Sequence, residues 1–231
     1  WLDNYWYHYK WVTLVSAFFI IVFSVLTAQM LTKEKPDSVI LYGGPAALTA
    51  NETRDLETAF KSILPSDFNA DGKKLVQLEA VSLMTEDQVA EAEAKAAEDS
   101  SVFVYNSKAL GSNKTTFTQL LMSGEYVILL VDPAQYDDIL DSGALVPLAD
   151  IFEENDMPDC AYDDCAIVFS ETAFAQYYNG STAALPDDTL LCVLRESENS
   201  LFKGKEKADT QYRQQLLLYK KIVNFSKGKS K

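Results

Sequence analysis

YVILLVDPAQYDDILD, residues 126–141, is the segment of this 231-residue chain that says most about its fold. Residues 126–131 are apolar without alternation, which is typical of a central parallel strand buried on both faces. Asp132 then stands at a helix N-cap position, and Pro133 occupies the first helical position, where its missing N–H costs nothing. The segment therefore predicts a buried strand that leads directly into a helix, the building unit of α/β sheets.

The same succession of strands and helices continues on both sides of this segment. Apolar runs predict further strands at 38–42, 75–83, 166–169 and 189–194. Helical spacing and capping residues predict helices that begin at Thr49 and Thr85, and others at 116–122, 133–141, 171–178 and 208–225. We therefore expect one α/β domain over residues 38–226, with three layers and a mostly parallel sheet.

A second segment, WVTLVSAFFIIVFSVLTAQML at 11–31, predicts one transmembrane helix. It holds no charged residue and spans about 30 Å as a helix, the thickness of a bilayer's hydrocarbon core. Residues 1–10 form an aromatic lead-in whose Trp and Tyr suit the headgroup region, and residues 32–37 form a polar linker. A buried core helix would carry a polar stripe, and a cleaved signal peptide would have a shorter apolar region, so both alternatives fit less well.

The charge of the chain is distributed unevenly. Residues 33–202 hold 10 lysines and arginines against 31 aspartates and glutamates, a net charge of −21, whereas residues 203–231 hold 9 against 2. The acidic body argues against a nucleic-acid partner, because phosphates would be repelled. We expect the basic tail at 227–231 to be a solvated end, with anionic lipid or cell-wall polymer as the alternative contact.

Few residues of the chain could carry catalysis. His8, the single histidine, precedes the apolar segment, so Ser-His-Asp catalysis, Cys-His catalysis and imidazole-based zinc sites are excluded from the domain. Cys160 and Cys165 are close enough to pair across a turn, and this pairing stays open. Cys192 lies in an apolar run and is expected to be a buried small hydrophobe. We expect a protein that is not an enzyme; a carboxylate-based hydrolase is an alternative with less support.

Candidate ligand-binding residues lie at the expected carboxyl edge of the sheet. Gly43 and Gly44 follow the first strand, and Asp132 follows the strand at 126–131. Ligands of open α/β sheets bind beyond the carboxyl ends of strands, and helix N-termini attract anions. The structural alternatives are a tight turn at the glycines and a helix N-cap at Asp132.

DFNADGK, residues 67–73, is a candidate calcium loop. Its candidate ligands are the side chains of Asp67, Asn69 and Asp71 and the carbonyl of Lys73. This spacing surrounds one point with oxygens, and it resembles the first half of the calcium loops of the EF-hand and dockerin families. The second half of the segment departs from that calcium-loop pattern. Its twelfth position holds Leu78 instead of glutamate, and the nearest carboxylate, Glu79, follows one residue later. The alternative is an ordinary turn in which Asp and Asn side chains accept backbone N–H groups.

Residues 117–152 resemble the bacterial extracellular solute-binding proteins of ABC importers. The shared features are a helix that ends in Ser-Gly-Glu at 123–125, the strand and helix at 126–141, and a Gly-x-Leu-x-Pro-Leu segment at 143–148. The resemblance implies one lobe of a type II periplasmic-binding-protein fold. The aromatic run NYWYHYKW at 4–11 looks like the membrane lead-in of Firmicutes surface proteins, which implies a domain outside the cell. Solute-binding proteins close two lobes over a ligand, and this chain has room for one.

These features predict a membrane-anchored, extracellular binding or accessory domain related to a solute-binding-protein lobe. Its partners would be the membrane and either a small ligand or another membrane protein, and its one expected cofactor is calcium. The alternative is a structural component of a larger membrane assembly that takes no small ligand.

Overall fold

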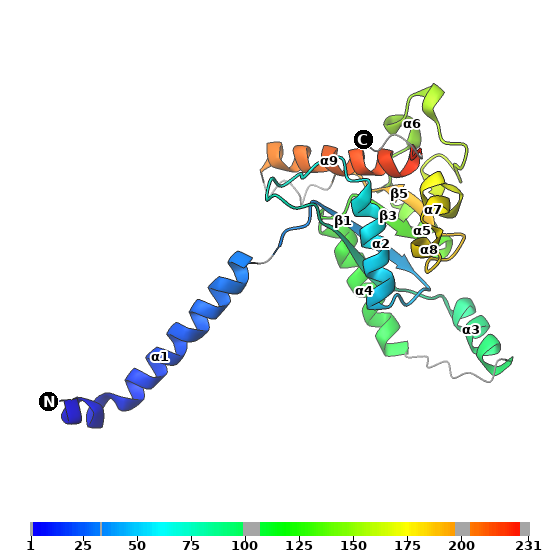
Figure 1. Cartoon of the computed structure of the whole chain (residues 1–231). Coiled ribbons are helices and arrows are strands. Elements are labelled where there is room, and N and C mark those ends of the chain that lie inside the picture. Colours follow the sequence, from blue (N-terminus) through cyan, green and yellow to red (C-terminus); the bar gives the residue numbers. More distant parts are fainter. Residues whose placement is uncertain (1, 33, 99–106, 197–203, 227–231) are drawn as a thin grey trace. The chain divides into compact units, whose positions relative to one another are not determined.

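The computed structural model describes residues 2–32, 34–98, 107–196 and 204–226, and the chain divides into two compact units, Trp1–Lys35 and Pro36–Lys231 (Figure 1). The basic tail expected at 227–231 lies outside the described residues. The first unit consists of one helix, α1 (Leu2–Thr32), within which Trp6–Ala28 is long and apolar enough to cross a membrane. A signal sequence near the amino terminus can pass the same test of length and composition. The aromatic lead-in belongs to the same helix rather than to a separate segment.

The second unit contains the expected α/β domain. Its strands are β1 (Ser38–Gly44), β2 (Val76–Ser82), β3 (Ile128–Val131), β4 (Ala166–Val168) and β5 (Leu190–Val193). Its longer helices are α2 (Ala50–Ser62), α3 (Glu86–Glu98), α4 (Ser107–Met122), α5 (Pro133–Asp141) and α9 (Lys205–Val223). Its short helices are α6 (Leu148–Ile151), η1 (Glu154–Asp156), η2 (Phe169–Glu171), α7 (Ala173–Tyr177) and α8 (Asn179–Thr182).

The five strands form one sheet in the order β2-β1-β3-β5-β4. β1 is parallel to both β2 and β3, whereas β5 is antiparallel to both of its neighbours, so the sheet is mixed. The reversal has a local cause. The N–H of Phe169, directly after β4, donates to the carbonyl of Thr189, directly before β5, at 2.9 Å. Because the chain leaves and re-enters the sheet at the same point, β5 runs back along β4 as in a hairpin.

Both faces of the sheet are covered, which gives the three expected layers. Successive residues of a strand point to opposite faces, and Ile40 and Tyr42 of β1 belong to one core cluster whereas Leu41 belongs to the other. The first cluster includes residues of α2, α7 and α9, and the second includes residues of α4 and α5. Since the central strands are buried on both sides, they read as continuous apolar runs in the sequence.

Two helices differ in extent from those expected. α4 begins at Ser107 rather than at residue 116, and its early turns carry no apolar periodicity from which this start could be seen. On α9 the residues expected to face the core do so: Tyr219 is buried, and Tyr212, Leu216 and Val223 are partly buried and pack against the first cluster. The other buried residues of α9 are Ala208, Gln215, Leu218 and Ile222, so the buried face is wider than expected. Gln215 is 4% exposed because its side chain accepts a hydrogen bond from the Ser38 hydroxyl and donates one to the Asp37 carbonyl.

Candidate functional site

The carboxyl ends of β1 and β3 meet at the point where the strand order reverses. From β1 the chain proceeds to β2 on one side and later to β3 on the other, and such switch points are where open α/β sheets bind ligands. Gly43 and Gly44 end β1, and Asp132 directly follows β3. The N–H of Asp132 donates to the carbonyl of Gly43 at 2.9 Å. The fold therefore brings the three candidate ligand-binding residues together.

The two glycines allow close packing rather than a turn. Both belong to β1, so the turn that we expected at 43–45 begins only at Pro45. A Cβ atom on Gly43 would lie 2.3 Å from Cε2 of Phe117, and one on Gly44 would lie 2.6 Å from the Tyr42 hydroxyl oxygen. Real Cβ atoms do not come so close to other heavy atoms. Each glycine is therefore covered by an aromatic side chain, which sequence reasoning did not find.

Asp132 is the N-cap of α5, as expected. One carboxylate oxygen accepts the N–H of Ala134 at 2.9 Å, and the other accepts the side-chain amide of Gln88 at 3.0 Å. Burial raises the pKa of Asp132, these two hydrogen bonds lower it, and the nearby charge of Asp188 raises it, with a raised pKa as the result. The carboxylate is 4% exposed, so its main contacts are within the protein.

The rim around Asp132 supplies hydrogen-bond acceptors and negative charge. Asp188, two residues before β5, is exposed and acts electrostatically on both Asp132 and Tyr42. Burial raises the pKa of Tyr42 to about 12, so its hydroxyl stays protonated and accepts the N–H of Ala46 at 3.1 Å. A ligand that donates hydrogen bonds or carries positive charge suits this rim. In the sequence Asp188 is visible only as one of several adjacent carboxylate pairs, with Asp187, and Gln88 only as a helix-capping residue.

The candidate calcium loop at 67–73 has a defined conformation. Backbone N–H groups of Gly72, Asp71 and Lys73 donate at 2.7, 2.9 and 2.9 Å to carboxylate or amide oxygens of Asp67, Asn69 and Asp71, respectively. Ala70 and Gly72 adopt positive φ, which lets the chain turn sharply. The second carboxylate oxygen of Asp67 is buried and has no hydrogen-bond partner. The loop therefore leaves one buried oxygen available.

Asp37 fixes this loop to the start of β1. Its carboxylate accepts the N–H groups of Phe68, Asn69 and Leu75 at 2.6, 3.1 and 2.8 Å. We had assigned Asp37 to the linker, so this contact was missed. Across the described ranges, which break at 99–106 and 197–203, no three His, Cys, Asp or Glu side chains form a metal-binding group. Leu78, at the twelfth loop position, lies in β2, and its N–H donates a hydrogen bond to the Glu57 carboxylate at 2.9 Å.

The three cysteines are free thiols. Cys160 is half-buried, Cys165 and Cys192 are buried, and burial raises the pKa of all three. Cys192 lies in the second core cluster, as expected for a small hydrophobe. Because the thiolate is the nucleophile, raised pKa values make these thiols weak nucleophiles.

Comparisons of the chain with protein-family models, curated proteins and solved structures find no match. Its function must therefore be inferred from its own residues. The features that bear on function are the switch point between β1 and β3, the loop at 67–73 and the apolar helix α1.

Replacing Gly43 with alanine should destabilise the domain by about 1–3 kcal/mol, because the new methyl group overlaps the buried ring of Phe117. Urea unfolding followed by circular dichroism measures this. Gly180→Ala is the matched control, since nothing lies within 4 Å of its Cβ position. Adding Phe117→Leu to Gly43→Ala should recover part of the loss, and an unchanged unfolding midpoint in Gly43→Ala would contradict the packing described.

The raised pKa of Asp132 predicts a pH dependence of stability. Below 3.8, the ordinary pKa of an aspartate, the carboxyl is protonated in both the folded and the unfolded state. As pH rises from 3.8 to the raised folded-state pKa, the unfolded chain ionises before the folded one, so wild type should lose stability relative to Asp132→Asn, which keeps an N-cap side chain. The measurement is the difference in unfolding free energy between pH 3.5 and 7.

The matched control for this experiment is Asp138→Asn, a change at an exposed position of the same helix. A wild-type stability that instead rises with pH, relative to Asp132→Asn, would mean that hydrogen bonds to the carboxylate outweigh its burial.

Proposed function

We propose that the chain is a single-pass membrane protein whose acidic α/β domain works outside the cell as a non-enzymatic binding or accessory module, related to one lobe of a solute-binding protein. The observation that carries the binding role is the switch point, where parallel β1 and β3 end side by side at Gly43 and Asp132. The membrane role is supported by the stretch Trp6–Ala28 of α1, which is long and apolar enough to cross a membrane.

The chemistry of the rim points to the class of ligand. Asp188 is exposed and acts electrostatically on the buried carboxyl group of Asp132, whereas the glycines offer no side chain. A small polyhydroxy compound or an amine would meet acceptors there, and an anion would be repelled. One lobe covers one side of a ligand, so binding should be weak compared with that of an enclosed pocket. This supports sensing or docking rather than high-affinity capture.

The alternative, a structural part of a membrane assembly with no small ligand, is favoured by one observation. Phe117 and Tyr42 cover the two glycines, and both oxygens of Asp132 are already hydrogen-bonded within the domain. In that case the switch point is a packed junction, and the exposed acidic surface is where other subunits would contact the domain.

A thermal-shift screen of the full chain in detergent separates the two functions. A bound polyol or amine at a hundredfold excess over its Kd should raise Tm by about 5–10 °C, and Asp188→Asn should reduce that rise. Asp187→Asn, at the adjacent exposed position, is the matched control. If no compound raises Tm and chemical cross-linking in native membranes captures a defined partner, the structural role is the correct one.

The membrane role predicts how the chain behaves in cells. The full chain should stay in the membrane pellet after alkaline carbonate extraction, because α1 buries an apolar surface in lipid. Protease added to intact cells should degrade the domain. Release by carbonate, together with a shortened amino terminus, would identify α1 as a cleaved signal sequence, and full protection from protease would place the domain inside the cell.

We also propose a weak calcium site in the loop at 67–73. Asp67, Asn69, Asp71 and the Lys73 carbonyl would hold the ion, and the buried carboxylate oxygen of Asp67 that lacks a hydrogen-bond partner supports this fit. Bound calcium would supply positive charge that neutralises the loop and stiffens it. Because the set contains two carboxylates and lacks the glutamate of a complete loop, the Kd should be on the order of 10⁻⁴–10⁻³ M.

Calcium at 5–10 mM should therefore raise the Tm of the full chain in detergent by about 3–6 °C. Asp71→Ala should abolish the rise, and Asp71→Asn should reduce it although the amide can still accept the Lys73 N–H. Asp55→Ala, an exposed change on α2, is the matched control. Equal shifts in wild type and Asp71→Ala would leave the loop as an ordinary turn.

A further inference from the structure

The Gln88 side chain bridges the helices that follow the two strands beside β1. β1 lies between β2 and β3 and is parallel to both, so the carboxyl ends of all three strands meet at one edge. Gln88 is in the first turn of α3, shortly after β2, and Asp132 directly follows β3. The side-chain amide of Gln88 donates to Oδ2 of Asp132 at 3.0 Å. This hydrogen bond therefore crosses the carboxyl end of β1, which is the switch point.

The same Gln88 amide also begins α3. Its oxygen accepts the N–H of Thr85 at 2.9 Å, and the Thr85 hydroxyl accepts the N–H of Gln88 at 3.2 Å. These two bonds form a capping box, which satisfies N–H groups that the first helical turn leaves without partners. One amide thus connects the N-terminus of α3 to the N-cap of α5. A change in the bond to Asp132 therefore acts directly on α3.

The rest of α3 has few contacts with the domain. Val89 is its buried residue, and none of residues 90–98 is buried. Within the described part of the chain, the Gln88–Asp132 bond is the one side-chain hydrogen bond that joins α3 to another helix. Figure 1 shows α3 projecting away from the sheet. One hydrogen bond and one buried valine therefore hold this helix against the domain.

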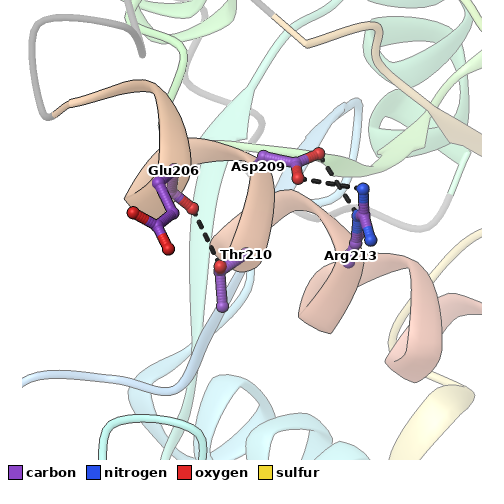
Figure 2. A network of polar contacts seen from close by, with 4 residues as sticks. All are labelled: Glu206, Asp209, Thr210 and Arg213. Atoms are coloured by element: carbon purple, nitrogen blue, oxygen red, sulfur yellow. Dashed lines mark hydrogen bonds and ion pairs between the residues drawn. The ribbon is translucent and has the colours of Figure 1, made fainter.

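The ion pair of α3 lies within the helix and does not anchor it. The Lys95 ammonium is 3.2 Å from the carboxylate of Glu91, four residues earlier. Figure 2 shows the same kind of pair on α9, where Arg213 contacts Asp209 at 3.2 and 3.0 Å. Such pairs stabilise the helix that contains them. α9 also buries five residues in the domain, whereas α3 buries Val89, so α3 is the helix that can move at low cost.

The switch point is closed while this bond is made. Gly43 and Gly44 are buried, and Asp132 is 4% exposed. Oδ1 of Asp132 accepts the N–H of Ala134 and is needed as the N-cap of α5. Oδ2, which accepts the amide of Gln88, is therefore the oxygen that a ligand can take over without loss of the cap.

We infer that the Gln88–Asp132 hydrogen bond is a latch that holds α3 at the switch point, and that a ligand releases α3 by donating to Asp132 in place of Gln88. The exchange replaces an amide donor with an ammonium or hydroxyl donor, so the buried carboxylate keeps its hydrogen bonds. The position of α3 then depends on whether the site is occupied. This regulation rests on the proposed binding role of the switch point, whereas the latch itself can be tested without a ligand.

An exchange of donor and acceptor tests the latch. Gln88→Glu keeps the acceptor for Thr85 but places a carboxylate against Asp132, and Asp132→Asn keeps the cap of α5 but places an amide against that of Gln88. Each change should speed up hydrogen exchange of backbone amides 90–98 about tenfold, measured by mass spectrometry on the full chain in detergent. In the double variant the asparagine amide can donate to the glutamate, so exchange should return to within about twofold of wild type. Gln77→Glu, at an exposed position of β2, is the matched control.

Two probes test the release of α3. Ethanolamine and glycerol, each at about 10 mM, supply ammonium and hydroxyl donors. At least one of them should speed up exchange of amides 90–98 in wild type by about fivefold, because it competes with the amide of Gln88. Asp188→Asn should reduce the effect of ethanolamine, since the rim then loses a negative charge.

The other outcomes overturn the inference at different points. Single variants that exchange like wild type, or a double variant as fast as the singles, refute the latch. A probe that raises Tm without changing exchange at 90–98 binds but does not release α3, which refutes the regulation and leaves the proposed function intact. If neither probe changes Tm or exchange, even in Gln88→Met, whose side chain cannot donate to Asp132, both the regulation and the binding role of the switch point are wrong.

Discussion

The buried carboxylate of Asp37 connects three parts of the domain that are far apart in the sequence. It accepts three backbone N–H groups from the segment between α2 and β2, it stands directly before β1, and its own carbonyl is bound by Gln215 of α9. A charge buried without partners costs several kcal/mol, and charge-assisted hydrogen bonds offset that cost. The loop at 67–73, the first strand and the last helix are therefore positioned by one group.

This arrangement assigns different chemistry to the two ends of β1. At the amino end lie the loop at 67–73 and α9, and at the carboxyl end lies the switch point with Asp132. β1 has seven residues, so these ends are about 20 Å apart. The chain enters the domain at the amino end of β1. A ligand at the switch point would therefore bind at the end of the sheet opposite to this entry point.

Much of the fold could be predicted from local patterns, because continuous apolar runs and capping residues are signals within a few residues of each other. The N-caps at Thr49 and Asp132 are examples. The direction of β5 could not be predicted, since it depends on the contact between residues 169 and 189. The same holds for Gln215, whose burial depends on a partner 177 positions away, and for Phe117 over Gly43. The candidate site residues were identifiable, but whether they are open to a ligand depends on such distant neighbours.

The position of β5 has a consequence for how the domain is made. β5 is the last strand in the chain, yet it lies between β3 and β4 and completes the middle of the sheet. Until residue 193 has been synthesised, β3 has one edge without a strand partner. Its apolar residues stay exposed until α9 and β5 cover them. A domain of this design cannot fold progressively from its amino end as it emerges. The unpaired edge of β3 has to be protected from other chains until β5 and α9 have been synthesised.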